Sequence, residues 1–119
     1  MATHDLLFLG VNKRIPRGKI TSTAREGLKW YDRVRVGDLL NLIETETNER
    51  FAQAVCIGVH AMPLGQVIAQ APANHAFDAA IEDGKSPPAL YVRKSIAAAY
   101  GDHDDRDIFS VVQFLVISE

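Results

Sequence analysis

The stretch RGKITSTAREG, residues 17–27, carries three cations and three consecutive hydroxyl side chains, and only two of its residues are apolar enough to require burial. Its segment ITSTA, residues 20–24, is rich in β-branched residues and predicts an extended strand. The preceding residues 13–19 contain Pro16 and Gly18 and predict a loop. A polar strand of this kind suits the floor of a cleft that meets an anionic or polar ligand. The alternative interpretation is a solvated strand at a sheet edge.

Working outward from this strand, the chain alternates strand and helix patterns. Short apolar or alternating runs predict strands over 5–11, after the Gly37-Asp38 turn up to residue 45, over 51–61 and over 109–117, with a hairpin loop at 46–50. Helical patterns cover 74–84 and 86–101, with a further short helix over 63–70. We therefore expect an α+β fold, a small mixed β-barrel of about five or six strands with two or three flanking helices.

The helix ends can be placed from their capping residues. Asn74 is expected to cap the first of the two longer helices. Ser86 is expected to cap the helix over 86–101, with Pro87 at its first helical position and Gly101 just beyond its end.

Length and composition fit one domain spanning residues 1–119, and a hydrophobic content of 47% allows a real core. No apolar run approaches the roughly 20 residues of a membrane helix, so no membrane partner is expected. The N-terminal residues show no basic leader, and the single cysteine, Cys56, cannot form an internal disulfide. These features favour a cytoplasmic location.

The charge of the chain is unevenly distributed. The net charge is −2, yet residues 13–35 hold eight Lys and Arg residues against two acids, a local net of +6, and residues 101–107 (GDHDDRD) form an acidic cluster. Surface ion pairs contribute only about 0–1 kcal/mol each, so folding gives weak reason to cluster the cations. The asymmetry predicts one basic face.

Several short motifs occur in the order of a known family. They are the basic, Thr-rich IPRGKITSTAR (15–25), a VGD turn leading into a strand (36–40), a hairpin and strand (52–59), a helix ending in YG (100–101) and a VxxFxV strand (111–116). In this order and spacing the chain resembles the ASCH domain, a β-barrel of the PUA-like superfamily.

The resemblance implies a role in nucleic-acid chemistry. ASCH domains are proposed to bind RNA, one small branch removes the acetyl group from acetylcytidine, and other members are described as ribonucleases. We therefore expect a domain that binds RNA or a modified nucleoside in a basic polar cleft around residues 17–25. One alternative is a small hydrolase acting on RNA or nucleosides, and another is a protein-interaction module. No cofactor is expected, and the oligomeric state stays open.

The deacetylating branch implies a Lys base, a Thr nucleophile three residues later and an acid before the last helix. Counting back from Arg25, Thr23 matches the nucleophile, and the Lys position falls on Ile20, one residue after Lys19. Neighbouring strand residues face opposite sides, so Lys19 serves only if a turn around Gly18 re-aims it.

Alternatively, Thr21 supplies the hydroxyl, because it lies on the same side of the strand as Thr23. Asp83, with Glu82 as its neighbour, matches the acid. The candidate catalytic residues are Lys19, Thr23 and Asp83, and the candidate binding residues are Arg17, Thr21, Ser22, Arg25 and Tyr31.

Aromatic side chains lie inside the basic segment. Trp30 and Tyr31 could stack on unpaired bases, an interaction worth about 1–3 kcal/mol per base. The alternative is that they close the end of the barrel as core residues, which is favoured for Trp30.

Metal chemistry is not expected. None of the four histidines stands at ligand spacing from a cysteine or another histidine. The acidic run around His103 lacks the Gly and Glu of a calcium loop and is interpreted as a solvated loop.

Overall fold

The computed structural model describes residues 1–9 and 15–119. The last residues of the strand expected over 5–11, and the expected loop and cations at 13–14, lie outside the described residues. The strands are β1 (Thr3–Phe8), β2 (Ile20–Glu26), β3 (Leu39–Glu44), β4 (Arg50–Pro63) and β5 (Ile108–Ser118).

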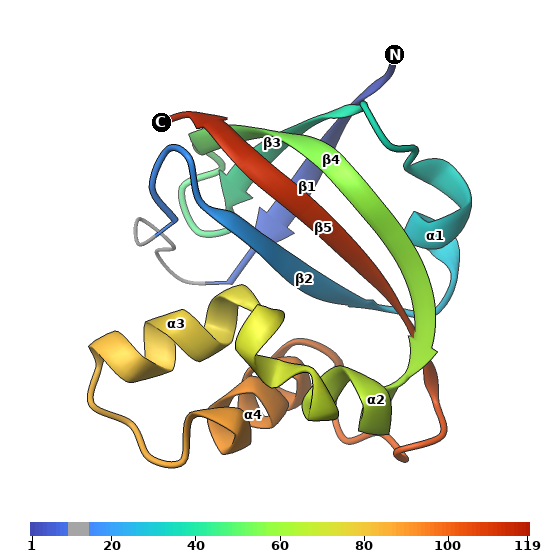
Figure 1. The fold of residues 1–119 in the computed structure, drawn as a ribbon, viewed down its shortest axis with the longest axis vertical. Coiled ribbons are helices and arrows are strands. Elements are labelled where there is room, and N and C mark those ends of the chain that lie inside the picture. The colour runs from blue at the N-terminus through green and yellow to red at the C-terminus, as the bar shows by residue number, and fades with distance from the viewer. Residues whose placement is uncertain (10–14) are drawn as a thin grey trace.

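All five strands belong to one sheet in the order β1-β3-β4-β5-β2. Strand β1 runs parallel to β3, and every other pairing is antiparallel. The first two strands of the chain are therefore the two edges of the sheet. The sheet is curved, as Figure 1 shows, but among the described residues β1 and β2 do not pair, so the sheet is not closed. The expected α+β class is confirmed, with an open mixed sheet where a barrel was expected.

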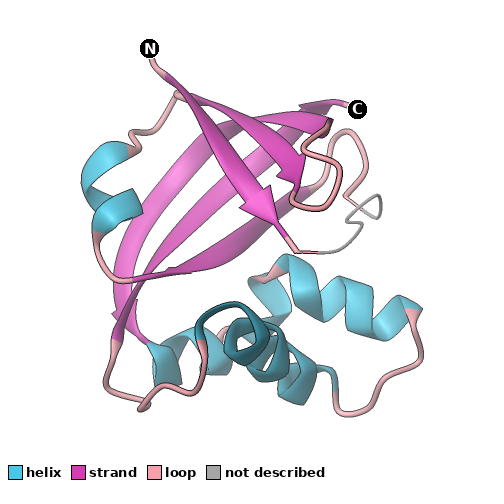
Figure 2. Ribbon diagram, turned by 180° about the vertical axis from the view of Figure 1, so that it is seen from behind, coloured by secondary structure: helices cyan, strands magenta, loops and turns pink. Residues whose placement is uncertain are grey.

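Most of the helices gather at one end of the sheet. They are α1 (Lys29–Arg33), α2 (Leu64–Ala69), the 3₁₀ turn η1 (Ala71–Ala73), α3 (His75–Glu82) and α4 (Pro88–Tyr100). Figures 1 and 2 show α2, α3 and α4 packed together on the side away from both chain termini, whereas α1 lies against the flank of the sheet. We call α2, α3 and α4 together the helical layer, and the edge strands β1 and β2 face it.

The core consists of two clusters on either side of β2 and β5. Residues Val112, Phe114 and Val116 of β5 point into the curve of the sheet with the buried residues of β1, β3 and β4. Residues Phe109 and Val111, earlier on the same strand, pack against α2 and α4. Strand β5 is therefore buried on both faces, which explains its continuous apolar sequence.

The helix limits match the expected ones closely, with one error. Asn74 does cap α3, since its side chain accepts a hydrogen bond from the backbone N–H of Ala76 at 2.9 Å. Ser86 does not cap α4, because that helix begins at Pro88 and Pro87 occupies the capping position. The expected placement is wrong by one residue because either proline of the pair can occupy a first helical position.

Helix α1 is absent from the sequence-based expectations. It has only five residues and none is buried, so no apolar period marks it in the sequence. It nevertheless positions Trp30, which packs against the core, and Tyr31, which is exposed.

The N-terminal end of β1 is held by one carboxylate. Asp38, in the turn before β3, accepts hydrogen bonds from the backbone N–H groups of Ala2 and Arg35 and contacts His4 Nε2 at 2.9 Å. These contacts, with His4 first, lower the pKa of Asp38 to about 2. The edge strand β1 is thereby fixed against the turn that precedes β3, the strand with which it pairs.

No helix in the described part of the chain is long and apolar enough to span a membrane.

Truncation inside the curve of the sheet tests this core. We expect Leu42→Ala to lower the free energy of unfolding by about 2–5 kcal/mol, because Leu42 is fully buried and its removal leaves a cavity. Ile20→Ala is the matched control, because Ile20 is 61% exposed, and should change it by less than about 0.5 kcal/mol. Chemical denaturation measures both, and equal effects would contradict the assignment of the core.

Candidate ligand-binding cavity

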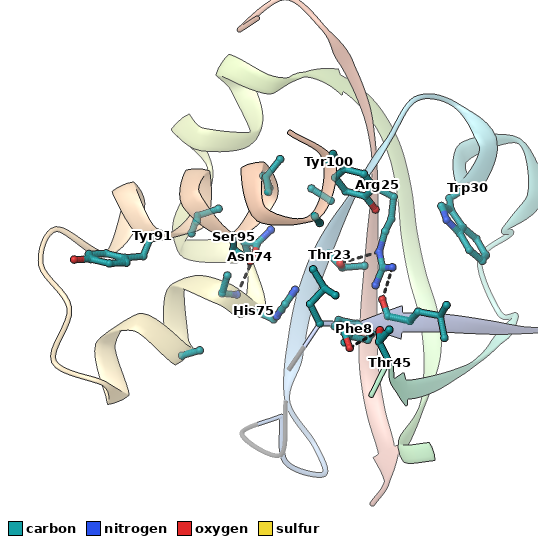
Figure 3. A pocket seen from close by; sticks show the side chains of 18 of the residues that line it. Phe8, Thr23, Arg25, Trp30, Thr45, Asn74, His75, Tyr91, Ser95 and Tyr100 are labelled. Atoms are coloured by element: carbon teal, nitrogen blue, oxygen red, sulfur yellow. Dashed lines mark hydrogen bonds between the residues drawn. The ribbon is translucent and has the colours of Figure 1, made fainter. Parts of the chain in front are cut away.

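A cavity of about 1020 Å³ lies between the two edge strands of the sheet, β1 and β2, and the helices α3 and α4. It is lined by residues of β1, β2, α1, α3 and α4, and Figure 3 shows their side chains converging from both layers. Its volume is that of a small-molecule site. The cavity therefore lies where β1 and β2 would pair if the sheet were closed into a barrel.

Arg25 forms the polar floor of this cavity. Its Nη1 donates to the backbone carbonyl of Leu7 on β1, its Nε donates to Thr23 Oγ1 at 3.2 Å, and its guanidinium lies over the ring of Phe8, 4.7 Å from the centroid. The side chain thus bridges the two edge strands that do not pair with each other.

The charge of Arg25 is buried without an acidic partner. Arg25 is 8% exposed, and no carboxylate among residues 1–9 and 15–119 forms an ion pair with it. Burial lowers its pKa from the usual value, and the neighbouring Tyr100 side chain partly offsets this effect. Since arginine stays protonated in proteins, the floor of the cavity contains a positive charge that no ion pair among the described residues neutralises.

His75, the first residue of α3, lies beside this charge. Its ring stands edge-on to Phe8 at a centroid distance of 5.0 Å. Its Nδ1 is buried and has no hydrogen-bond partner within the described residues. Burial, and then the charge of Arg25, lower the pKa of His75 to about 4, against a smaller opposite effect of Asp78. The imidazole is therefore neutral at pH 7.

The rest of the cavity divides into an apolar wall and a charged rim. The wall is formed by helix residues with small or aliphatic side chains, Ala76, Ala80, Val92, Ile96 and Ala99. The aromatic residues Phe8, Trp30, Tyr91 and Tyr100 also belong to the lining. The rim carries Lys29, Arg33 and Lys85 and the acids Asp5 and Asp83.

Comparison with solved structures identifies this architecture. An ASCH domain from Lactobacillus crispatus JV V101 superimposes with a TM-score of 0.62 and 12% sequence identity, covering 99% of this chain and 81% of that one. The chain has the ASCH-domain fold. A protein from Enterococcus faecalis V583, assigned to family DUF984, also matches, with a TM-score of 0.49 and 13% identity over 82% of this chain and 61% of that one. No protein-family model matches the sequence, and no curated protein matches it either.

Within this ASCH-domain fold, three of the eight candidate catalytic and binding residues line the cavity. They are Thr23, Arg25 and Asp83. Thr23 is 2% exposed, and its hydroxyl oxygen is occupied as the acceptor of the Arg25 Nε hydrogen bond. Asp83 reaches the cavity from the end of α3.

Lys19 lies elsewhere. Its Nζ forms an ion pair with Asp78 Oδ2 at 2.9 Å, both side chains are about 40% exposed, and Lys19 does not line the cavity. The Lys–Thr pair implied by the deacetylating branch of ASCH domains is therefore not brought together. The strand alternation accounts for this, because Lys19 precedes β2 and no bulge re-aims it.

The other sequence candidates are dispersed. Thr21 and Ser22 donate to the backbone carbonyl of Ala73 at 3.4 and 2.8 Å, so both hydroxyls tie β2 to η1. Arg17 and Tyr31 are exposed and lie outside the lining of the cavity. The polar run on β2 thus serves two purposes, attachment of the helical layer and formation of the cavity floor.

Sequence reasoning missed His75 and Tyr100 as cavity residues. For His75, the available signal was its position directly after the helix cap Asn74, because the positive end of a helix lowers the pKa of a histidine and so marks it as unusual. Tyr100 was noted only as part of a family motif. Neither signal indicates that the two residues approach a strand more than 45 positions away in the sequence.

The acidic segment near His103 is held by hydrogen bonds. His103 contacts Asp107 at 2.8 Å and Glu26 at 2.6 Å, and these contacts raise the pKa of His103. Within the described residues, no group of three or more His, Cys, Asp or Glu side chains could hold a metal ion.

The lowered pKa of His75 leads to a testable prediction about stability. The pKa of His75 is about 4 in the folded chain and 6.5 by default, so the unfolded state binds the extra proton between these values. The free energy of unfolding should therefore fall as pH drops from 6.5 to 4, by about 3 kcal/mol in total for this residue. Denaturation of the wild type and of His75→Gln at several pH values measures this difference, and parallel curves would contradict it.

Proposed function

We propose that this protein binds RNA or a nucleoside and that the cavity at the open sheet edge receives one nucleoside unit. The observation that carries the proposal is the buried guanidinium of Arg25, which lies in a cavity of nucleoside size and forms no ion pair with a carboxylate of residues 1–9 or 15–119. A buried cation of this kind is stabilised by a ligand that supplies phosphate or carbonyl oxygens.

The aromatic lining supports an unpaired base as the group that enters. Phe8, Trp30, Tyr91 and Tyr100 line the cavity, and aromatic rings bind bases that are not stacked in a duplex. At one side of the opening, Lys29 and Arg33 of α1 provide exposed cations that could contact the neighbouring phosphates. The fold shared with an ASCH domain agrees with this role.

The geometry favours binding over the hydrolase of the deacetylating type. That scheme needs a lysine base within hydrogen-bond reach of a threonine hydroxyl. Here Lys19 is paired with Asp78, and Thr23 contacts Arg25. A ribonuclease and a protein-interaction module remain alternatives that no contact in the cavity favours.

The first test of the proposal is the salt dependence of nucleic-acid binding. We expect single-stranded RNA oligomers to bind more tightly than duplex DNA of the same length, with a slope of log affinity against log salt of about −2 if two or three phosphates are contacted. Fluorescence anisotropy between 20 and 300 mM salt measures this slope. Absence of RNA binding at the lowest salt would overturn the proposal.

The second test locates the binding site. Ser95 is exposed on α4 and lines the cavity, so Ser95→Trp should fill it and weaken RNA or nucleoside binding at least tenfold. Ala98→Trp is the matched control, because Ala98 is exposed on the same helix but does not line the cavity, and it should bind like the wild type. Unchanged binding by the Ser95 variant would place the site on another surface.

A further inference from the structure

Three sources of positive potential meet at one end of the cavity. The guanidinium of Arg25 is buried there without an acidic partner among the described residues. The N-terminal turn of α3 contributes Asn74, His75 and Ala76 to the lining, and helix N-termini carry a partial positive charge. The third source is latent, because the buried Nδ1 of His75 has no hydrogen-bond partner in the part of the chain that the structure describes and can take up a proton.

We propose that this end of the cavity binds the phosphate group of a nucleotide, and that His75 takes up a proton when the phosphate binds. The inference rests on the proposed function, since it specifies which part of a nucleotide meets Arg25. The phosphate enters next to Arg25 and His75, and the base lies along the apolar wall formed by α3 and α4.

The division of the cavity supports this orientation. The polar side chains lie in the part of the cavity beside β1 and β2; they are Arg25, Thr23 and His75. The opposite part is lined by aliphatic side chains of α3 and α4, which include Ala80 and Val92. A planar base gains from contact with the aliphatic and aromatic wall, and a phosphate loses its hydration there without compensation. Only the Arg25 end offers charge-assisted hydrogen bonds to a phosphate.

The charged groups around His75 determine its protonation. Arg25 on β2 acts against the imidazolium, and Asp78, one turn along α3, favours it weakly because Asp78 is also paired with Lys19. From β1 the nearest packed side chain is the uncharged Phe8, and from α4 the hydroxyls of Tyr100 and Ser95 face the same cavity. The remaining ionisable residues of the lining are His4, Asp5, Lys29, Arg33, Asp83, Lys85 and Tyr91.

A bound anion reverses this balance. It neutralises the charge of Arg25 and adds an opposite charge beside the imidazole, and both effects raise the pKa of His75 from about 4 toward neutrality. The proton comes from solvent and gives Nδ1 a hydrogen to donate to a phosphate oxygen. Nδ1, which has no partner among the described residues, thereby acquires one from the ligand.

Sulfate is the first probe, because it keeps its double charge between pH 5.5 and 7.5, whereas a phosphate monoester titrates near pH 6. We expect sulfate affinity to rise about tenfold between pH 7.5 and pH 5.5 if one proton is taken up. Calorimetry at pH 6 in two buffers of different ionisation enthalpy measures the number of protons directly. The expected value is most of one proton for each sulfate bound.

The variants separate His75 from other titrating groups. His75→Gln should still bind sulfate through Arg25, but without proton uptake and without the rise in affinity at low pH. His60→Gln is the matched control, because His60 is exposed and outside this cavity, and it should behave like the wild type. Proton uptake that persists in His75→Gln would overturn the inference.

The ligand series distinguishes the sources of the phosphate and tests the proposed function separately. A nucleoside 5′-monophosphate should bind more tightly than both its nucleoside and sulfate, and a short oligonucleotide shows whether an internal phosphodiester serves as well. If nucleosides or RNA bind without proton uptake and sulfate does not compete, this inference fails and the proposed function stands. If sulfate binds with proton uptake but no nucleoside, nucleotide or RNA binds more tightly, the proposed function fails, and the site binds an adventitious ion only.

Discussion

The guanidinium of Arg25 holds together the two strands that the sheet leaves apart. Strands β1 and β2 are the edges of the five-stranded sheet, and Arg25 reaches from one to the other by donating to the carbonyl of Leu7 and packing on Phe8. In a closed barrel, backbone hydrogen bonds join the two edge strands. Here the Arg25 side chain joins them instead, and a space remains between the strands beside this side chain. The helical layer covers that space and turns it into a cavity.

The same arrangement gives the cavity its chemistry. Burial at the floor of the cavity removes water from Arg25, and helix α3 places His75 in the same cavity with a ring nitrogen that has no partner among the described residues. The guanidinium that bridges the two edge strands therefore also offers its positive charge to a ligand in the cavity. This dual role explains why the polar stretch 17–27 contains so few apolar residues although most of β2 is buried.

Much of the fold follows from local sequence. The strands, the three longer helices and the Asn74 cap were predictable, because alternation, helical period and capping chemistry act within a few residues. Helix α1 was not, since its five residues bury nothing. The order of the strands was not predictable either, because β1 and β2 are neighbours in sequence and opposite edges in the sheet. Strand alternation left open whether a turn around Gly18 re-aims Lys19, and the pairing of Lys19 with Asp78 depends on the packing of α3.

The sequence by itself determined the α+β class, the polar character of residues 17–27 and the placement of Thr23 and Arg25 on one face of a strand. The tertiary structure alone decided that the sheet stays open, that Arg25 spans the opening, and that His75 and Tyr100 share its cavity. The physical reason is the range of the interactions. Backbone conformation and side-chain alternation are set by neighbouring residues, whereas the burial of a charge depends on segments that only folding brings together.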